Sequence, residues 1–272
     1  MKIYKSIDEF NLVKDDLTDL SYVPTMGNLH KGHISLIDSA KKYGNEIISS
    51  IYINGLQFND ENDFINYPKT LDKDIELLLD HGCNHLLIPD KSILDNIEII
   101  KAPVKSNKLC GLSRPGHFDG VLTILNQFFK IIRPHTAIFG KKDYQQLILI
   151  KDFIKERNLR INILGEDTIR ESNGLALSSR NCLLTSEDKP KAPKLFEVLN
   201  DIKINKKDLS IELLNTKIEY LEKVGFTVDY LMACHKDTLE ECFNIDESDI
   251  LVAVAAKLGE VRLIDNIVLT KL

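Results

Sequence analysis

Two histidines stand three positions apart where a helix is expected to begin. Residues 24–33 read Pro-Thr-Met-Gly-Asn-Leu-His-Lys-Gly-His. A strand-like run ends at Pro24, and the helical spacing that follows places His30 and His33 about one turn apart at a helix N-terminus. Backbone N–H groups and imidazoles at such a terminus can bind phosphate oxygens as negative charge develops. The context of strand, turn and helix start favours a nucleotide site over a pair of surface histidines.

Two later clusters contain residues that bind anions. Residues 140–146 read Gly-Lys-Lys-Asp-Tyr-Gln-Gln, and residues 173–181 read Asn-Gly-Leu-Ala-Leu-Ser-Ser-Arg-Asn. A lysine after a strand can pair with triphosphate oxygens, and two hydroxyls before Arg180 suit an anion-binding loop. Taken alone, each cluster is also typical of an ordinary solvent-exposed loop, and Asp143 can be a simple helix N-cap. The three clusters together indicate an ATP site.

The elements that must position these residues alternate along the first part of the chain. Strand-like runs at 21–24, 47–53, 85–88, 136–139 and 161–164 are separated by helical spacing at 32–43, 71–81, 121–132 and 144–156. This alternation predicts an α/β fold with a Rossmann-like, mostly parallel sheet. Ligands of such sheets lie beyond the carboxyl ends of the strands, where the clusters are expected. Residues 91–109 show no clear periodicity and are expected to form a loop.

The pattern changes after Ile169. Helical segments at 192–202 and 209–224 precede strand-like runs at 227–233, 250–256 and 261–269, with a turn at Gly259-Glu260. We therefore expect a nucleotide-binding domain over 1–169 and a smaller α+β domain over 170–272.

Composition excludes several classes of protein. The 272 residues include 35 Lys+Arg and 41 Asp+Glu, a net charge of −6 that argues against a dedicated nucleic-acid binder. Five cysteines without Cys-x-x-Cys spacing predict free thiols in a reducing cytoplasm. Charges interrupt the first 20 residues, and apolar runs fall short of the ~18 residues of a membrane span, so neither a signal peptide nor membrane association is expected.

Four motifs, in order, resemble the pantothenate synthetase family. The family patterns are Pro-Thr-Met-Gly-x-Leu-His-x-Gly-His, Ser-Arg-Pro-Gly-His-Phe-x-Gly-Val, Phe-Gly-x-Lys-Asp-x-Gln-Gln-Leu and Gly-Leu-Ala-x-Ser-Ser-Arg-Asn. They are matched by residues 24–33, 113–121, 139–147 and 174–181, and the resemblance covers essentially the whole chain. It implies a ligase that activates pantoate with ATP as an acyl adenylate and passes the acyl group to β-alanine. The family also suggests a homodimer. Because Ser178, Ser179 and Arg180 lie just past the boundary near Ile169, we expect the C-terminal domain to act as a lid that brings them onto ATP.

The resemblance implies a role for individual residues. His33 holds the position of the proton donor and is expected to be catalytic together with His30, Lys142 and Arg180. The residues expected to hold ATP are Met26, Gly27, Asn28, Leu29, His30, Lys31, Gly32, His33, Gly140, Lys141, Lys142, Asp143, Ile169, Leu177, Ser178, Ser179 and Arg180. The residues expected at the acyl pocket are Gln57, Gln146, Asn54 and Tyr67, and Gln57 should also bind β-alanine. Asp74 is a candidate for the neighbourhood of Mg²⁺, which the phosphates are expected to hold for the most part.

The chain departs from the family at two positions. Asn54-Gly55-Leu56-Gln57-Phe58 stands where the family usually has Asn-Pro-x-Gln-Phe, so the turn loses the rigidity of proline. Lys141 replaces a usual glutamate and adds a positive charge near the expected phosphates.

Two rival functions stay open at this point. One is another enzyme of the same superfamily, either an adenylyltransferase that leaves AMP on its product or an aminoacyl-tRNA synthetase. Residues 170–272 hold 14 Lys+Arg against 18 Asp+Glu, which argues against a tRNA-binding surface. The other is a nucleotide-binding protein without catalysis, which the joint presence of His30, His33, Lys142 and Arg180 disfavours.

Overall fold

The computed structural model describes residues 1–271 and divides the chain into two compact units. Unit 1 comprises Met1–Ser106, Arg114–Lys141 and Gln146–Asp167. Unit 2 comprises Asn107–Ser113, Lys142–Gln145 and the chain from Thr168 onward. The sequence alone suggests one boundary near Ile169, whereas two short inner segments also belong to unit 2. The functions expected for the two domains stay predictions.

Unit 1 is built on a six-stranded sheet in which every pair of neighbours is parallel. This confirms the predicted Rossmann-like fold class. The strands, in spatial order, are β1 (Lys2–Tyr4), β4 (His85–Leu87), β3 (Glu46–Ile51), β2 (Leu20–Thr25), β5 (Thr136–Gly140) and β6 (Asn162–Glu166).

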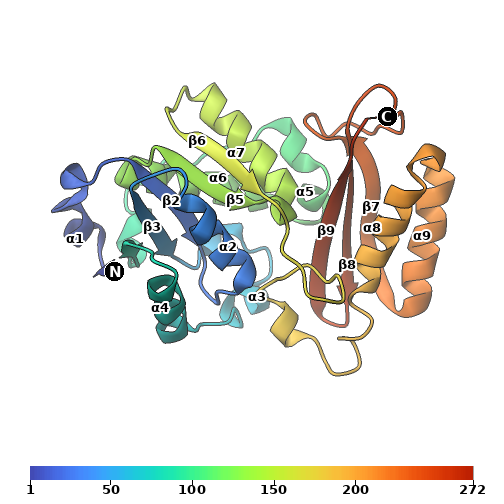
Figure 1. The fold of residues 1–272 in the computed structure, drawn as a ribbon, viewed down its shortest axis with the longest axis horizontal. Helices are drawn as coiled ribbons and strands as arrows, with labels where there is room; N and C mark the ends of the chain where they lie inside the picture. The colour runs from blue at the N-terminus through green and yellow to red at the C-terminus, as the bar shows by residue number, and fades with distance from the viewer. Residues whose placement is uncertain (272) are drawn as a thin grey trace. The chain divides into compact units, whose positions relative to one another are not determined.

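Both faces of this sheet pack against apolar cores. Alternate residues of each strand point to opposite sides, and the residues on both sides are mainly apolar. Tyr22 of β2 belongs to the core under α1 (Ile7–Asn11), α6 (His117–Ile132) and α7 (Tyr144–Glu156). The next residue, Val23, belongs to the core under α2 (Lys31–Ala40) and α4 (Leu71–Asp80). Helices therefore cover the sheet on both sides (Figure 1).

The strand order reverses between β2 and β5. From β2 the chain moves outward through β3 and β4 on one side, and from β5 it moves to β6 on the other. β2 pairs with β3 over its whole length, but its register with β5 covers only Ser21↔Thr136 and Tyr22↔Ala137. The carboxyl-terminal halves of β2 and β5 therefore diverge at the topological switch point, the usual ligand site of doubly wound sheets.

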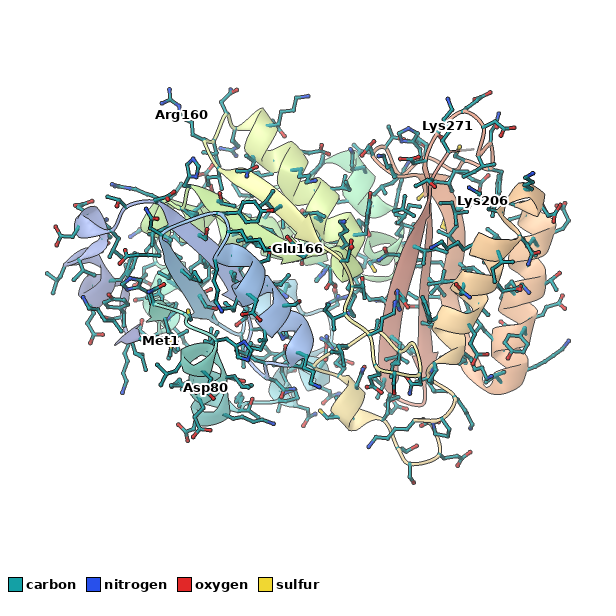
Figure 2. The ribbon with its side chains drawn as sticks, viewed as in Figure 1. Met1, Asp80, Arg160, Glu166, Lys206 and Lys271 are labelled. Carbon is teal, nitrogen blue, oxygen red and sulfur yellow. The ribbon has the colours of Figure 1, made fainter. Side chains whose placement is uncertain are left out.

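A bond at the end of α2 fixes this helix to the edge of the sheet. Glu166 is the last residue of β6 and is labelled in Figure 2. The buried Ser39 hydroxyl, in the last turn of α2, donates to Glu166 Oε1 at 2.6 Å. The N-terminal end of α2 follows the turn after β2, so the helix begins beside the switch point.

Unit 2 confirms the predicted α+β pattern. Its antiparallel sheet consists of β7 (Phe226–His235), β8 (Ile250–Leu258) and β9 (Val261–Leu269). Figure 1 shows α8 (Lys194–Ile204) and α9 (Ile211–Val224) on one face of this sheet. The other face packs against Leu109 and Tyr144, which the two inner segments contribute.

The shortest elements escape prediction from the sequence. These are β1, α1, α3 (Glu61–Ile65), α5 (Cys110–Ser113) and the 3-10 turns η1 (Lys14–Asp16), η2 (Gly55–Gln57), η3 (Lys91–Leu94), η4 (Val104–Asn107), η5 (Lys141–Asp143), η6 (Asn181–Leu183) and η7 (Lys206–Asp208). Helices and turns of three to five residues are too short to show the 3.6-residue period, and β1 lacks the apolar run that made the other short strands recognisable. Within the described chain, no helix combines the length and the apolar character that a membrane crossing requires.

Candidate nucleotide and acyl site

The turn after β2 has an unusual backbone. Gly27 and Asn28 both have left-handed φ angles, 83° and 50°. A Cβ on residue 27 would lie 3.1 Å from Asp74 Oδ2 and 3.3 Å from Ile51 Cγ2. Both the conformation and the close approach of neighbours therefore require glycine at this position of the motif.

Asp74 of α4 holds this turn in place. Its carboxylate accepts N–H bonds from Asn28 at 2.9 Å and from Leu29 at 2.7 Å, and a hydroxyl bond from Thr70 at 3.1 Å. The residue is 1% exposed. These bonds give Asp74 a structural role, and its expected role near Mg²⁺ stays a prediction that they do not support. Among residues 1–271, no cluster of three or more His, Cys, Asp or Glu side chains could hold a metal ion.

His30 and His33 form a capping box at the start of α2. His30 is the N-cap, and its Nδ1 accepts the N–H of Gly32 at 3.1 Å. His33 Nδ1 accepts the N–H of His30 at 3.3 Å, and the two ring centroids lie 4.1 Å apart. The spacing that the sequence presents as a catalytic motif is therefore also a helix cap.

This cap decides which ring nitrogens carry protons. A neutral imidazole that accepts through Nδ1 carries its proton on Nε2. The capping bonds of His30 and His33 therefore make both Nε2 atoms donors. The N-terminus of a ten-residue helix adds the positive end of its dipole, a combination suited to an anion.

The turn after β3 carries two of the expected acyl-site residues. The Asn54 amide, 1% exposed, donates to Gln57 Oε1 and to Gly120 O, each at 3.0 Å. Gln57 Nε2 in turn contacts Met26 Sδ at 3.2 Å. The structure thus brings Gln57 together with Met26, which begins the expected ATP turn.

Gly120 of α6 makes this arrangement possible. A Cβ at residue 120 would lie 2.2 Å from Leu56 O and 2.8 Å from Gln57 N. Only glycine lets α6 approach η2 so closely, which explains the second glycine of the family pattern matched by residues 113–121. Tyr67 is buried and contacts the ring of Phe58 edge-on, with centroids 5.8 Å apart.

Lys141, the lysine at the family's usual glutamate position, forms an ion pair in the loop after β5. Lys141 Nζ lies 2.6 Å from Asp167 Oδ1, so a carboxylate partly offsets its added charge. Gly140 ends β5, and Gln146 lies half-buried in the first turn of α7. Its neighbour Gln145 is structural instead, because its amide bonds Lys108 O at 2.6 Å and the Cys110 N–H at 3.0 Å.

The remaining expected ATP residues belong to unit 2. Ile169 and Leu177 are joined by a backbone bond of 2.9 Å from the Leu177 N–H to the Ile169 carbonyl. The Ser178 hydroxyl accepts the Arg180 N–H at 3.3 Å. The expected residues that lie in unit 2 are Lys142, Asp143, Ile169, Leu177, Ser178, Ser179 and Arg180, and the others lie in unit 1.

An ion pair that the sequence did not suggest holds the turn at Gly174, which precedes the Ser178–Arg180 loop. The Arg170 guanidinium donates to both carboxylate oxygens of Asp265, at 2.5 and 2.9 Å, and to Gly174 O at 3.1 Å. It also lies over the ring of Phe196, 3.8 Å from the centroid. Asp265 lies 95 residues away in the chain, so no local pattern could reveal this pair.

The doubly wound sheet, with a helix N-terminus at its switch point, defines unit 1 as a Rossmann-like fold. The whole chain belongs to the family described as Pantoate-beta-alanine ligase, whose sequence model matches residues 2–268. The family resemblance and the enzyme class, a ligase, are thereby confirmed.

Relatives and solved structures agree with this assignment. A pantothenate synthetase of Shewanella sp. (strain ANA-3) is 42% identical over 255 residues, covering 91% of this chain and 90% of that protein. The crystal structure of pantothenate synthetase from Thermus thermophilus has a TM-score of 0.91 at 32% identity, covering 99% of this chain and 100% of that one. The pantoate-beta-alanine ligase of Francisella tularensis, complexed with beta-gamma ATP and beta-alanine, has a TM-score of 0.84 at 35% identity, covering 98% and 97%.

Proposed function

We propose that the chain joins pantoate to β-alanine at the expense of ATP, through a pantoyl adenylate. Membership of the family supports the ligation, and the complexed Francisella enzyme supports ATP and β-alanine as substrates. The observation that carries the adenylate route is the start of α2. There, two imidazoles that accept backbone bonds through Nδ1 provide Nε2–H donors at a helix N-terminus.

In the first step, the carboxylate of pantoate attacks the α-phosphorus of ATP. An acyl–O–P bond forms, the bond from the α-phosphorus to the bridging oxygen breaks, and pyrophosphate leaves. Two anions must approach each other, and the donors of His30 and His33 together with the helix dipole would offset their repulsion. In the second step, the amine of β-alanine attacks the acyl carbon and AMP leaves, which needs positioning and exclusion of water.

Gln57 and Gln146 are proposed to bind pantoate. An amide both donates and accepts, which suits a substrate that carries hydroxyl groups and a carboxylate. The contact of Gln57 with Met26 supports a placement of pantoate beside the ATP turn. Asn54, which bonds the Gln57 amide, would fix the orientation of that amide.

Lys142, Ser178, Ser179 and Arg180 are proposed to bind the phosphates from unit 2, which would then act as a lid. A fragment that ends near Ile169 tests this poorly, because it also removes the sheet that Leu109 and Tyr144 pack against. Arg180→Ala in the full chain is the better test. It should abolish most adenylate formation while a thermal melt still shows a folded chain.

Mg²⁺ is proposed to enter with ATP, held mainly by the phosphates, whose charge it would neutralise. The bonds that Asp74 already makes to the turn favour this over a dedicated protein site. A homodimer is proposed from the family, and a cytoplasmic location stays a prediction.

The decisive experiment is ATP–pyrophosphate exchange measured with and without pantoate. The adenylate route predicts exchange that requires pantoate but not β-alanine. Exchange that ignores pantoate, or that appears only after β-alanine is added, would disprove that route. Release of AMP that depends on the amine separates this reaction from that of an adenylyltransferase that leaves AMP on its product.

A further inference from the structure

One motif of the sequence has no role in the chemistry described so far. It is the segment 113–121, whose last five residues begin α6. Two of its side chains converge on a single atom of the turn after β3. His117 Nδ1 lies 2.7 Å from the carbonyl oxygen of Gln57, and Arg114 Nη2 donates to the same oxygen at 3.1 Å.

The partners of His117 determine its tautomer. A carbonyl oxygen only accepts, so Nδ1 must carry the proton that it donates to Gln57. On the other side of the ring, Nε2 lies 3.2 Å from Arg114 Nη1, and a guanidinium only donates. His117 is therefore neutral and protonated on Nδ1, and it is 7% exposed. The guanidinium, the imidazole and the Gln57 carbonyl form a directed chain of hydrogen bonds.

Further bonds hold the segment against the turn. Asn59 Nδ2 donates to Pro115 O at 2.7 Å, and the Asn54 amide reaches Gly120 O at 3.0 Å. The backbone of Gln57 is thus fixed by Arg114 and His117, while its side chain is held by Asn54 and Met26. Because this turn has Gly55 where the family usually has proline, its geometry depends on these partners more than a proline turn would.

We infer that Arg114 and His117 are positioning residues for pantoate, which act through the Gln57 carbonyl to set the direction of the Gln57 amide. This inference rests on the proposed role of Gln57 in binding pantoate. Loss of the His117 donor frees the backbone of residue 57 and weakens pantoate binding. ATP binding at the start of α2 does not depend on this donor.

The test uses the full chain and steady-state kinetics on His117→Leu and His117→Asn. An asparagine amide can place an N–H near the position of Nδ1, whereas leucine cannot. His117→Leu should raise the KM for pantoate about tenfold, the scale of one hydrogen bond, with the KM for ATP within about twofold of the parent. His117→Asn should recover most of the loss. His135→Asn, at an exposed position of the same unit, is the matched control.

Arg114→Met is a second test of the same inference. Arg114 is only half-buried, and its loss leaves the His117 donor to the Gln57 carbonyl in place. It should raise the KM for pantoate by a smaller factor and add little in the His117→Leu background. The inference is overturned if His117→Leu leaves the KM for pantoate unchanged. It is also overturned if both KM values rise together with a lower melting temperature that His117→Asn does not correct. Absence of pantoate-dependent exchange in the parent chain would instead disprove the proposed function.

Discussion

At the scale of single residues, His33 has two tasks that can be separated. Its Nδ1 caps α2, and its Nε2–H is the donor proposed for catalysis. His33→Ala should lower kcat by about 10²–10³-fold, the usual effect of losing one donor to developing charge. It should also destabilise the chain by about 0.5–1 kcal/mol, because the cap is lost. From the sequence alone, only a small loss of stability is expected at this helix start.

His33→Asn distinguishes the two tasks of this residue. An asparagine oxygen can accept the capping N–H, but its amide does not reach the position of Nε2. The variant should therefore recover stability in a thermal melt while its kcat stays low. A kcat equal to that of the parent in both variants would show that His33 only caps the helix.

His85 should make stability depend on pH. This residue begins β4, is 3% exposed, and has its Nδ1 3.0 Å from the Tyr4 hydroxyl. Burial lowers the pKa of His85, and the charge of Glu46 opposes this only in part. Below about pH 6.5, the ordinary pKa of histidine, the unfolded chain therefore binds more protons than the folded chain, and stability falls as the pH falls.

Thermal melts between about pH 7.5 and 5.5, either side of the ordinary pKa, measure this effect. The melting temperature of His85→Gln should fall less over this range than that of the parent. The exposed His135→Gln is the control and should follow the parent. Equal slopes for parent and His85→Gln would contradict the prediction.

At the scale of elements, η2 carries the departure of this chain from its family. Gly55 is the first residue of this 3-10 turn, where proline is well tolerated, and a Cβ there would lie 3.6 Å from the nearest Phe64 atoms. Gly55→Pro should therefore stabilise the chain by about 0.4–1 kcal/mol through the unfolded state. It should also lower the KM for pantoate and leave that for ATP nearly unchanged.

Urea titrations and substrate titrations of both variants test this prediction. A proline that holds the turn by itself should also reduce the effect of His117→Leu when the two substitutions are combined. Destabilisation and weaker pantoate binding in Gly55→Pro would mean that the backbone of residue 55 cannot accept proline.

Long strands and helices could be predicted from the sequence, whereas the contacts that support the site could not. The β-branched run after Gly44 predicts β3, and the helical spacing of α7 predicts its bounds, because burial on both faces or on one stripe leaves a strong pattern. The site motifs predict the switch point but not its support. Asp74 contacts a turn 45 residues away, and the choice between Gln145 and Gln146 depends on which way each side chain points. Such tertiary contacts leave no periodic trace in the sequence.

At the scale of the whole molecule, each unit contains a buried cysteine that reports on its unfolding. Burial raises the pKa of Cys83 to about 11 and that of Cys234 to about 12, so both thiols should resist alkylation in the folded chain. Cys182 is exposed and should react first with iodoacetamide. In rising urea, Cys83 and Cys234 should become reactive over the same range, because inner segments of unit 2 interrupt the sequence of unit 1.

Mass spectrometry of the labelled peptides gives the two transitions separately. Cys182→Ser is the control and should leave both transitions in place. Labelling of Cys234 at urea concentrations that leave Cys83 protected would show that the units unfold independently.

The inner segments of unit 2 also set an order of events during synthesis on the ribosome. Ser113 closes the first of these segments, and Phe226, the first residue of β7, is added more than 100 residues later. At ~5–20 residues per second, this delay lasts roughly 6–20 s. The parallel sheet is complete when Glu166 has emerged, but Leu109 and Tyr144 still lack the sheet against which they pack. The nascent chain therefore leaves the apolar side chains of Leu109 and Tyr144 uncovered until β7 to β9, in about the last sixth of the chain, have been made.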